Sequence, residues 1–197
     1  MEKMKKTARG LDKFFKVLYV LVWVLVAILA LSLVLMAAAP FIEPLRTTIN
    51  TLELGGFTFT LAPGHGWDGS PAYSVVMLTL AVVSVILAGW EIRIIRKILK
   101  PMTEGVAFHD SVGGNLKKLG WLQIAGGLLS NAAAFAGQLL ILNAYDLEQL
   151  FVSEKITAVN LGYELDISFV VTAAVFFLAS YIFRYGTKLQ QLSVETL

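Results

Sequence analysis

The sequence predicts an all-α integral membrane protein with four transmembrane helices and a small β-hairpin or β-sheet cap. The first observation is composition: 57% of the 197 residues are apolar and 15% are charged, whereas a soluble globular domain has about 45–50% and about 25%. The second is that four long stretches lack any charged residue. The third is a period-two alternation of side chains in the two loops that we place on the outer side, which predicts the cap.

The four uncharged stretches cover residues 17–42, 69–90, 119–145 and 167–183. A helix needs about 20 apolar residues to cross a hydrocarbon core of roughly 30 Å, and the first three stretches exceed that length. The fourth is shorter, but Arg184 can extend its guanidinium into the headgroups. The first stretch is too long for the apolar part of a signal peptide. We therefore predict transmembrane helices over 17–40, 71–92, 119–143 and 167–185.

The distribution of Lys and Arg predicts the orientation of these helices. Fourteen of the 16 lie in the N-terminal segment 1–16, in the middle loop or towards the C-terminus, and only Arg46 and Lys155 lie elsewhere. By the positive-inside rule, both termini and the middle loop are cytoplasmic. The chain then forms one membrane domain, 1–197, in which the cytoplasmic parts are 1–16, 93–118 and 186–197 and the outer loops are 41–70 and 144–166.

Both outer loops contain strand signals. Phe and Thr alternate over 57–60 after Gly55-Gly56, which is typical of a β-hairpin with a two-residue connection. In the second outer loop, Leu161, Tyr163 and Leu165 alternate with polar residues or glycine. Because an isolated hairpin is barely stable in water, we expect both loops to share one small antiparallel sheet.

The middle loop begins with a basic amphipathic segment. Ile92, Ile95 and Leu99 recur at helical spacing among Arg and Lys residues, so the second helix is expected to continue until Pro101 stops it. The N-terminal segment 1–16 is a weaker version of the same pattern. Such segments anchor on anionic lipid, or provide a docking surface for a cytoplasmic partner.

Small and polar residues form a pattern on the third predicted helix. They recur every four residues, with one Asn beside them: Gly126, Ser130, Ala134 and Gln138, with Asn131. Small residues let helices approach closely in lipid, and polar side chains avoid hydrocarbon. Three interpretations remain open: packing within the four-helix bundle, a homodimer seam, and a path for a polar substrate.

The sequence indicates no catalytic, cofactor or metal site. There is no Cys, and the predicted topology separates His65 from His109, so they cannot share a metal ion. His109-Asp110-Ser111 contains the three residue types of a hydrolase triad, but neighbours in sequence cannot easily form its hydrogen-bond chain. Glu91, near the inner interface, is expected to pair with Arg93 or Arg184. We expect no enzyme activity and no cofactor, and the net charge of +2 is too small to indicate nucleic-acid binding.

Two segments resemble a known family. The matching pattern covers Ile98-Leu99-Lys100, Glu104-Gly105 with Phe108, the basic run from Asn115 to Trp121, Leu165 to Phe169, and Ile182 to Gly186 with Leu189-Gln190. It resembles the domain-of-unknown-function 2975 family of bacterial four-helix membrane proteins. The resemblance implies the bacterial inner membrane and a role in regulation, with no known activity or cofactor. In this family-motif set, Gly105 is in the turn, Phe108 is expected to pack under the bundle, Asn115 to cap or start the third helix, and Arg184 with Gly186 to end the fourth.

These observations together predict a non-enzymatic membrane protein with a sensing, regulatory or partner-binding role. The alternative is a small oligomeric transporter or channel that uses the small, polar face of the third helix. The expected partners are the lipid bilayer, a second copy of the chain through the third helix, or another membrane or regulatory protein.

Overall fold

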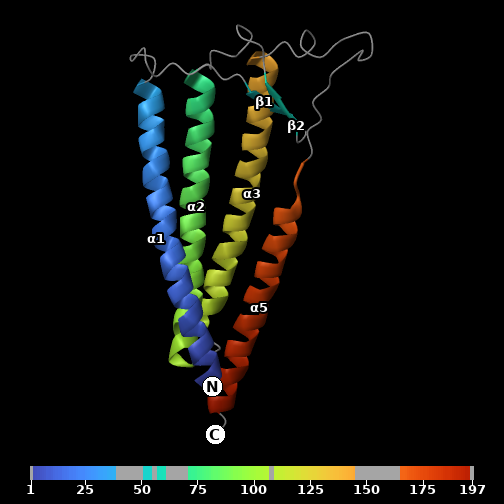
Figure 1. Cartoon of the computed structure of the whole chain (residues 1–197). Coiled ribbons are helices and arrows are strands. Elements are labelled where there is room, and N and C mark those ends of the chain that lie inside the picture. The colour runs from blue at the N-terminus through green and yellow to red at the C-terminus, as the bar shows by residue number, and fades with distance from the viewer. Residues whose placement is uncertain are drawn as a thin grey trace. The chain divides into compact units, whose positions relative to one another are not determined.

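The computed structural model describes residues 2–38, 51–54, 57–60, 71–106, 109–144 and 165–195. In these ranges the elements are, in order, α1 (Glu2–Ala38), β1 (Thr51–Leu54), β2 (Phe57–Thr60), α2 (Pro71–Glu104), α3 (Asp110–Ala144) and α5 (Ser168–Glu195) (Figure 1). Each of the four described helices is long and apolar enough to cross a membrane. The predicted set of four membrane-spanning helices is confirmed at this level.

The chain divides into two compact units. Unit 1 contains Met1–Ala27, Val83–Ser130 and Leu165–Leu197, and unit 2 contains Ile28–Val82 and Asn131–Glu164. Every side chain that the described residues bury deeply lies in unit 1. The apolar ones are Ala8, Ile92, Leu99, Pro101, Val112, Leu116, Leu119 and Ala173, and the polar ones are Asn115, Ser180 and Thr187. Unit 1 therefore holds the core, to which all four helices contribute.

Glycine at intervals of seven residues brings α3 and α5 together in unit 1. A Cβ atom on Gly113 would lie 2.6 Å from Cγ of Arg184, and one on Gly120 would lie 2.6 Å from Cε1 of Phe177. Gly127 meets the ring of Phe169 in the same way. Seven residues make nearly two helical turns, so the three glycines share one face and the two backbones can approach closely.

Polar contacts and one further glycine join the remaining helices of unit 1. Gly89 of α2 faces Val22 of α1, where a Cβ atom would lie 3.3 Å from Cγ1 of Val22. Gln123 Nε2 of α3 donates a hydrogen bond to Glu91 Oε1 of α2 over 2.9 Å. The hydroxyl of Ser180 on α5 donates to the carbonyl oxygen of Gly113 on α3 over 2.7 Å. Each pair of helices that is adjacent in the chain is thus also in contact within unit 1.

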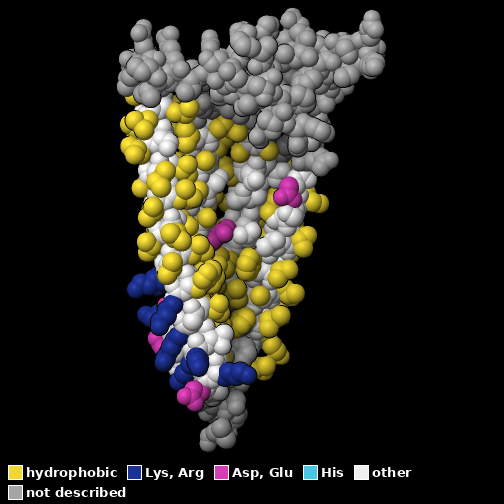
Figure 2. Space-filling model, viewed as in Figure 1, with side chains coloured by type: hydrophobic (Ala, Val, Ile, Leu, Met, Phe, Trp, Pro, Cys, Tyr) yellow, Lys and Arg dark blue, Asp and Glu magenta, His cyan; other side chains and the backbone are white. Residues whose placement is uncertain are grey.

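The outward surface of α1 is apolar along its length beyond the first turns. Val20, Val24, Ile28 and Leu31 are all more than half exposed, and Figure 2 shows hydrophobic side chains covering this part of the helix. Water would penalise such a surface, whereas hydrocarbon does not. The burial pattern is therefore that of helices whose outer faces contact lipid.

The prediction that Pro101 stops the second helix is wrong. α2 continues for another turn, to Glu104. It ends at Gly105, whose φ of 97° is the left-handed conformation that glycine adopts without steric cost. The Gly105 N–H donates to the Met102 carbonyl and the Val106 N–H to the Pro101 carbonyl, at 3.2 and 3.0 Å, which is a Schellman cap. Proline removes only one donor, so a helix secured by this cap tolerates it near its end.

Two expectations about the ends of the third and fourth helices are also wrong. α3 begins at Asp110, so Asn115 lies inside the helix and is buried rather than capping it. α5 runs to Glu195, so Arg184 and Gly186 do not end it. Gly186 has no positive φ, and the Thr187 hydroxyl donates to the Phe183 carbonyl within the continuing helix. A lone glycine weakens a helix but ends it only where its conformation changes.

Unit 2 contains the two strands and parts of three helices. β1 and β2 pair antiparallel, with Thr51 opposite Thr60 and Leu54 opposite Phe57. The sheet in the described residues has these two strands alone, so the predicted cap shared by both outer loops is not supported. Most of the second outer loop, including Leu161 and Tyr163, lies outside the described residues. Within unit 2, Gly137 of α3 faces Met77 of α2.

Candidate functional site

Charged residues gather where α1 begins, α2 ends, α3 begins and α5 ends, all within unit 1. We call this region the charged end and define it as residues 2–16, 93–106, 109–118 and 184–195. Figure 1 shows these four helix ends close to one another, and Figure 2 shows Lys and Arg side chains over the first turns of α1. The cavity, the groove and the polar contacts described first lie in this region or directly beside it.

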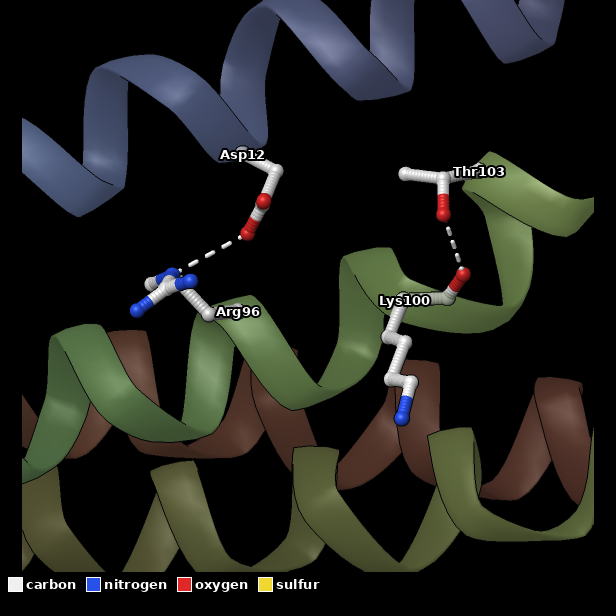
Figure 3. Close-up of polar contacts among 4 residues, drawn as sticks. All are labelled: Asp12, Arg96, Lys100 and Thr103. Atoms are coloured by element: carbon white, nitrogen blue, oxygen red, sulfur yellow. Dashed lines mark hydrogen bonds and ion pairs between the residues drawn. The ribbon is translucent and has the colours of Figure 1, made fainter.

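An ion pair joins α1 and α2 at the charged end. Arg96 Nε donates to Asp12 Oδ1 over 3.0 Å (Figure 3). The two side chains remain 32% and 35% exposed, so water screens the pair. Exposed pairs of this kind contribute about 0.2–1 kcal/mol. The contact therefore adds little stability and shows only that Asp12 of α1 lies opposite Arg96 of α2. It is the only ion pair among the described residues.

A polar cavity of about 530 Å³ lies beside this ion pair. Four residues of α1 and the last turn of α2 line it: Lys5, Arg9, Asp12, Lys13, Thr103 and Glu104. The Thr103 hydroxyl donates to the Lys100 carbonyl over 2.7 Å, which holds it against its own helix, as Figure 3 shows. Lys5 lies over the turn after α2, because a Cβ atom on Gly105 would lie 3.0 Å from Lys5 Nζ. The cavity has more cations than carboxylates and suits an anionic ligand or segment.

A second groove lies between α2 and α3. It has a volume of about 480 Å³, and its lining combines three cations, two indoles and two aliphatic side chains: Arg93, Lys97, Lys118, Trp90, Trp121, Ile94 and Leu122. Trp90 and Trp121 are 52% and 58% exposed. Trp121 also contacts Phe177 of α5 edge to face, with ring centres 5.6 Å apart. None of the described residues that line this groove is acidic.

Glu91 does not form the ion pair expected from the sequence. It hydrogen-bonds to the Gln123 amide, and neither Arg93 nor Arg184 pairs with it in the described residues. The amide neutralises no charge but satisfies one carboxylate oxygen between the helices. Charge complementarity favours an arginine, but the packing of α3 against α2 places the Gln123 amide opposite Glu91.

His109 and Ser111 form a helix cap. The Ser111 N–H donates to Nδ1 of His109 over 3.2 Å, and the Ser111 hydroxyl oxygen lies 2.8 Å from the same nitrogen. The imidazole thereby satisfies one of the free N–H groups at the start of α3. No three His, Asp or Glu side chains of the described residues are grouped so that they could hold a metal ion. His65 lies outside the described residues.

The small residues singled out on α3 are not one packed face. A Cβ atom on Gly126 would meet open space, and Ser130 and Ala134 are exposed. Asn131 and Gln138 are half-buried, and each makes a polar contact or other close interaction. Of the family-motif set, Gly105 forms the turn described above and Phe108 lies outside the described residues. A functional role for these residues stays a prediction.

Sequence inspection missed the face of α3 that contacts α5. The signal is present in the sequence as glycine at 113, 120 and 127, a seven-residue interval, beside the four-residue interval of Gly126, Ser130 and Ala134. It also missed Asp12, the single acid among the cations of residues 3–16, as the partner of Arg96. The groove of Trp90 and Trp121 could not be found without knowing the α2–α3 register.

These features define a class: the described residues form four helices that are long and apolar enough to cross a membrane, with one two-stranded hairpin, a packed core in unit 1 and a charged end. Comparisons with protein-family models, curated proteins and solved structures find no match.

Proposed function

We propose that the protein is a non-enzymatic, multi-pass membrane protein that binds a partner protein at its charged end and acts in sensing or regulation. The partner's contact segment is acidic. The observation that carries this proposal is the cavity beside the Asp12–Arg96 pair, in which Lys5, Arg9 and Lys13 outnumber the carboxylates.

The length of α1 favours a protein partner over lipid. Its 37 residues extend about 55 Å at 1.5 Å per residue, whereas hydrocarbon is roughly 30 Å thick and each headgroup layer adds about 5–8 Å. The uncharged part beyond Lys16 is long enough to fill the hydrocarbon. The first turns of a helix near the membrane normal then stand beyond the headgroups, where Lys5, Lys6 and Arg9 face water.

A photo-crosslinking experiment in native membranes tests this function. A benzophenone amino acid replaces Lys6, which is exposed and lines a hollow together with Lys5, Arg9 and Lys13 of the cavity. In a matched control it replaces Val20, which is exposed on the apolar part of the same helix. We expect a discrete protein adduct from position 6 and none from position 20. Charge reversal with Arg9→Glu and Lys13→Glu should abolish the adduct. Lipid adducts alone, or an adduct that survives charge reversal, would contradict the proposal.

The second candidate function is a small oligomeric transporter or channel. The open space beside Gly126 and the exposed Ser130 favour it, because a Cβ atom at Gly126 would contact none of the described residues around it and a second copy can cover this face. Flux through reconstituted vesicles that Asn131→Leu abolishes, together with loss of the oligomer in Gly126→Leu, would support this function. A monomer without flux would exclude it.

We further propose that the protein belongs to the domain-of-unknown-function 2975 family and resides in the bacterial inner membrane with both termini cytoplasmic. The motif around Gly105 supports the family, and the bias of Lys and Arg supports the orientation. Reporter fusions after Gly69 and Gly105 should be active on opposite sides of the membrane. Equal activity from both positions would reject this topology.

A further inference from the structure

The groove between α2 and α3 has its aromatic and cationic side chains in a fixed order along both helices. On α2, Trp90 precedes Arg93 by about one turn and Lys97 by about two; on α3, Lys118 precedes Trp121 by about one turn. α2 ends at the charged end and α3 begins there, so α2 runs towards this end and α3 runs away from it. Both indoles therefore lie on the apolar side and the cations on the side of the charged end.

This order matches the layers of a bilayer surface. Tryptophan concentrates at the boundary between headgroups and hydrocarbon, and Lys and Arg reach into the phosphate layer. α2 continues for 14 residues beyond Trp90, to Glu104. The groove thus sits where a phospholipid headgroup would lie, and not at the tip of the charged end.

None of the three cations of the groove forms an ion pair with another of the described residues. The described residues contain one ion pair, and it involves Asp12 and Arg96. The nearest acid along α2, Glu91, is engaged by the Gln123 amide between the helices and does not line the groove. Three like charges around one hollow repel one another, so an anion that enters is stabilised by all three.

We propose that this groove binds the headgroup of an anionic phospholipid. Arg93, Lys97 and Lys118 contact the phosphate, and Trp90 and Trp121 pack beside the glycerol and the first carbons of the acyl chains. The indoles select a lipid over a free phosphate, because a free phosphate presents nothing apolar to them. Basic hollows between transmembrane helices have this chemistry in general. The site is separate from the cavity that we assign to a partner protein.

Quenching of tryptophan fluorescence by brominated lipids tests the proposal. The full-length protein carries Trp23→Phe and Trp67→Phe, so that Trp90 and Trp121 report alone, and it is reconstituted with dibrominated phosphatidylglycerol or phosphatidylcholine at equal mole fraction. We expect stronger quenching by phosphatidylglycerol. Each cation replaced by Gln should lower the relative affinity about fivefold, and the triple variant R93Q/K97Q/K118Q should lose the preference.

The matched control removes the same number of charges elsewhere. Lys3, Lys16 and Lys188 are exposed and do not line the groove, so K3Q/K16Q/K188Q should keep the preference. Equal quenching by the two lipids, or a preference that the groove variant retains, would overturn the proposal. So would displacement of the lipid by inorganic phosphate, which would assign the groove to a soluble anion.

Discussion

Neighbouring glycines on α3 have different surroundings. Gly127 is pressed against the Cβ and ring of Phe169, whereas a methyl group on Gly126 would meet nothing within 4 Å. Both lie in the same helical turn, so their backbone conformation and helix propensity are matched. A difference in stability between alanine variants at these two positions therefore reports on the close contact between α3 and α5 alone.

Gly127→Ala should therefore destabilise unit 1, and Gly126→Ala should not. Forcing a methyl group into a packed contact costs about 1–3 kcal/mol, whereas alanine at an open helical position is neutral or favourable. Unfolding of both variants by SDS titration in mixed micelles measures the difference. Equal stability of the two variants would show that α3 and α5 do not meet at Gly127.

Asp166 precedes α5 and is held in its charged form by hydrogen bonds. The Ser168 hydroxyl and the Ser168 N–H, the latter at 2.8 Å from Oδ1, lower the pKa of this carboxyl below its ordinary value. Because the pKa of Asp166 is lower in the folded state than in the unfolded state, its ionised carboxylate stabilises the folded state at pH values above the unfolded-state pKa. This stabilisation is lost as the pH falls through the folded-state pKa.

The first turn of α5 should consequently fray in acid, below the pH at which a free aspartate titrates. Following the Ser168 amide resonance by NMR during an acid titration reports the transition. Asp166→Asn keeps an oxygen acceptor but cannot titrate, so its Ser168 resonance should not shift over the same range. A midpoint at or above the ordinary aspartate value would refute the assignment.

The α2–α3 turn depends on one backbone conformation. Gly105 combines a φ of 97° with the Schellman hydrogen bonds, and its Cα also lies beneath the Lys5 side chain. Any residue with a Cβ atom is strained in this conformation, whatever space Lys5 leaves. The turn is thus the point at which a helix that continues through Pro101 is made to end.

Gly105→Ala should destabilise the protein by about 1–2 kcal/mol, and Lys5→Ala should not restore the loss, because the strain is in the backbone. Thermal unfolding in detergent measures both variants. Gly114→Ala is the control, since Gly114 lies in helical α3 with open space around its Cα. Full rescue by Lys5→Ala would mean that side-chain crowding, and not φ, sets the cost.

Unit 1 as a whole requires α1 to pack against the second half of α2. The sequence contains no Cys, so this packing can be tested directly with an engineered pair of cysteines, because no native thiol competes with them. In Val22→Cys/Gly89→Cys, the sulfur at 22 takes the place of Cγ1, which lies 3.3 Å from a Cβ atom at 89. That separation is close to what a disulfide needs.

We expect this pair to form an intramolecular disulfide under mild oxidation in membranes, seen by mass spectrometry of the unreduced peptides. Val20→Cys/Gly89→Cys is the control, because Val20 is exposed and should not crosslink to position 89. Efficient crosslinking of the control, or none of the 22–89 pair, would contradict the packing of α1 in unit 1.

The sequence by itself determined the four membrane-spanning helices, because uncharged length is a property of each segment and needs no partner. Tertiary structure decided where the helices end and what faces them. α2 continues past Pro101 to its Schellman cap, and α5 continues through Gly186, because a helix end depends on backbone hydrogen bonds more than on residue type. Likewise, Asp12–Arg96, Glu91–Gln123 and the Trp90–Trp121 groove arise from register between helices, which composition and periodicity do not encode.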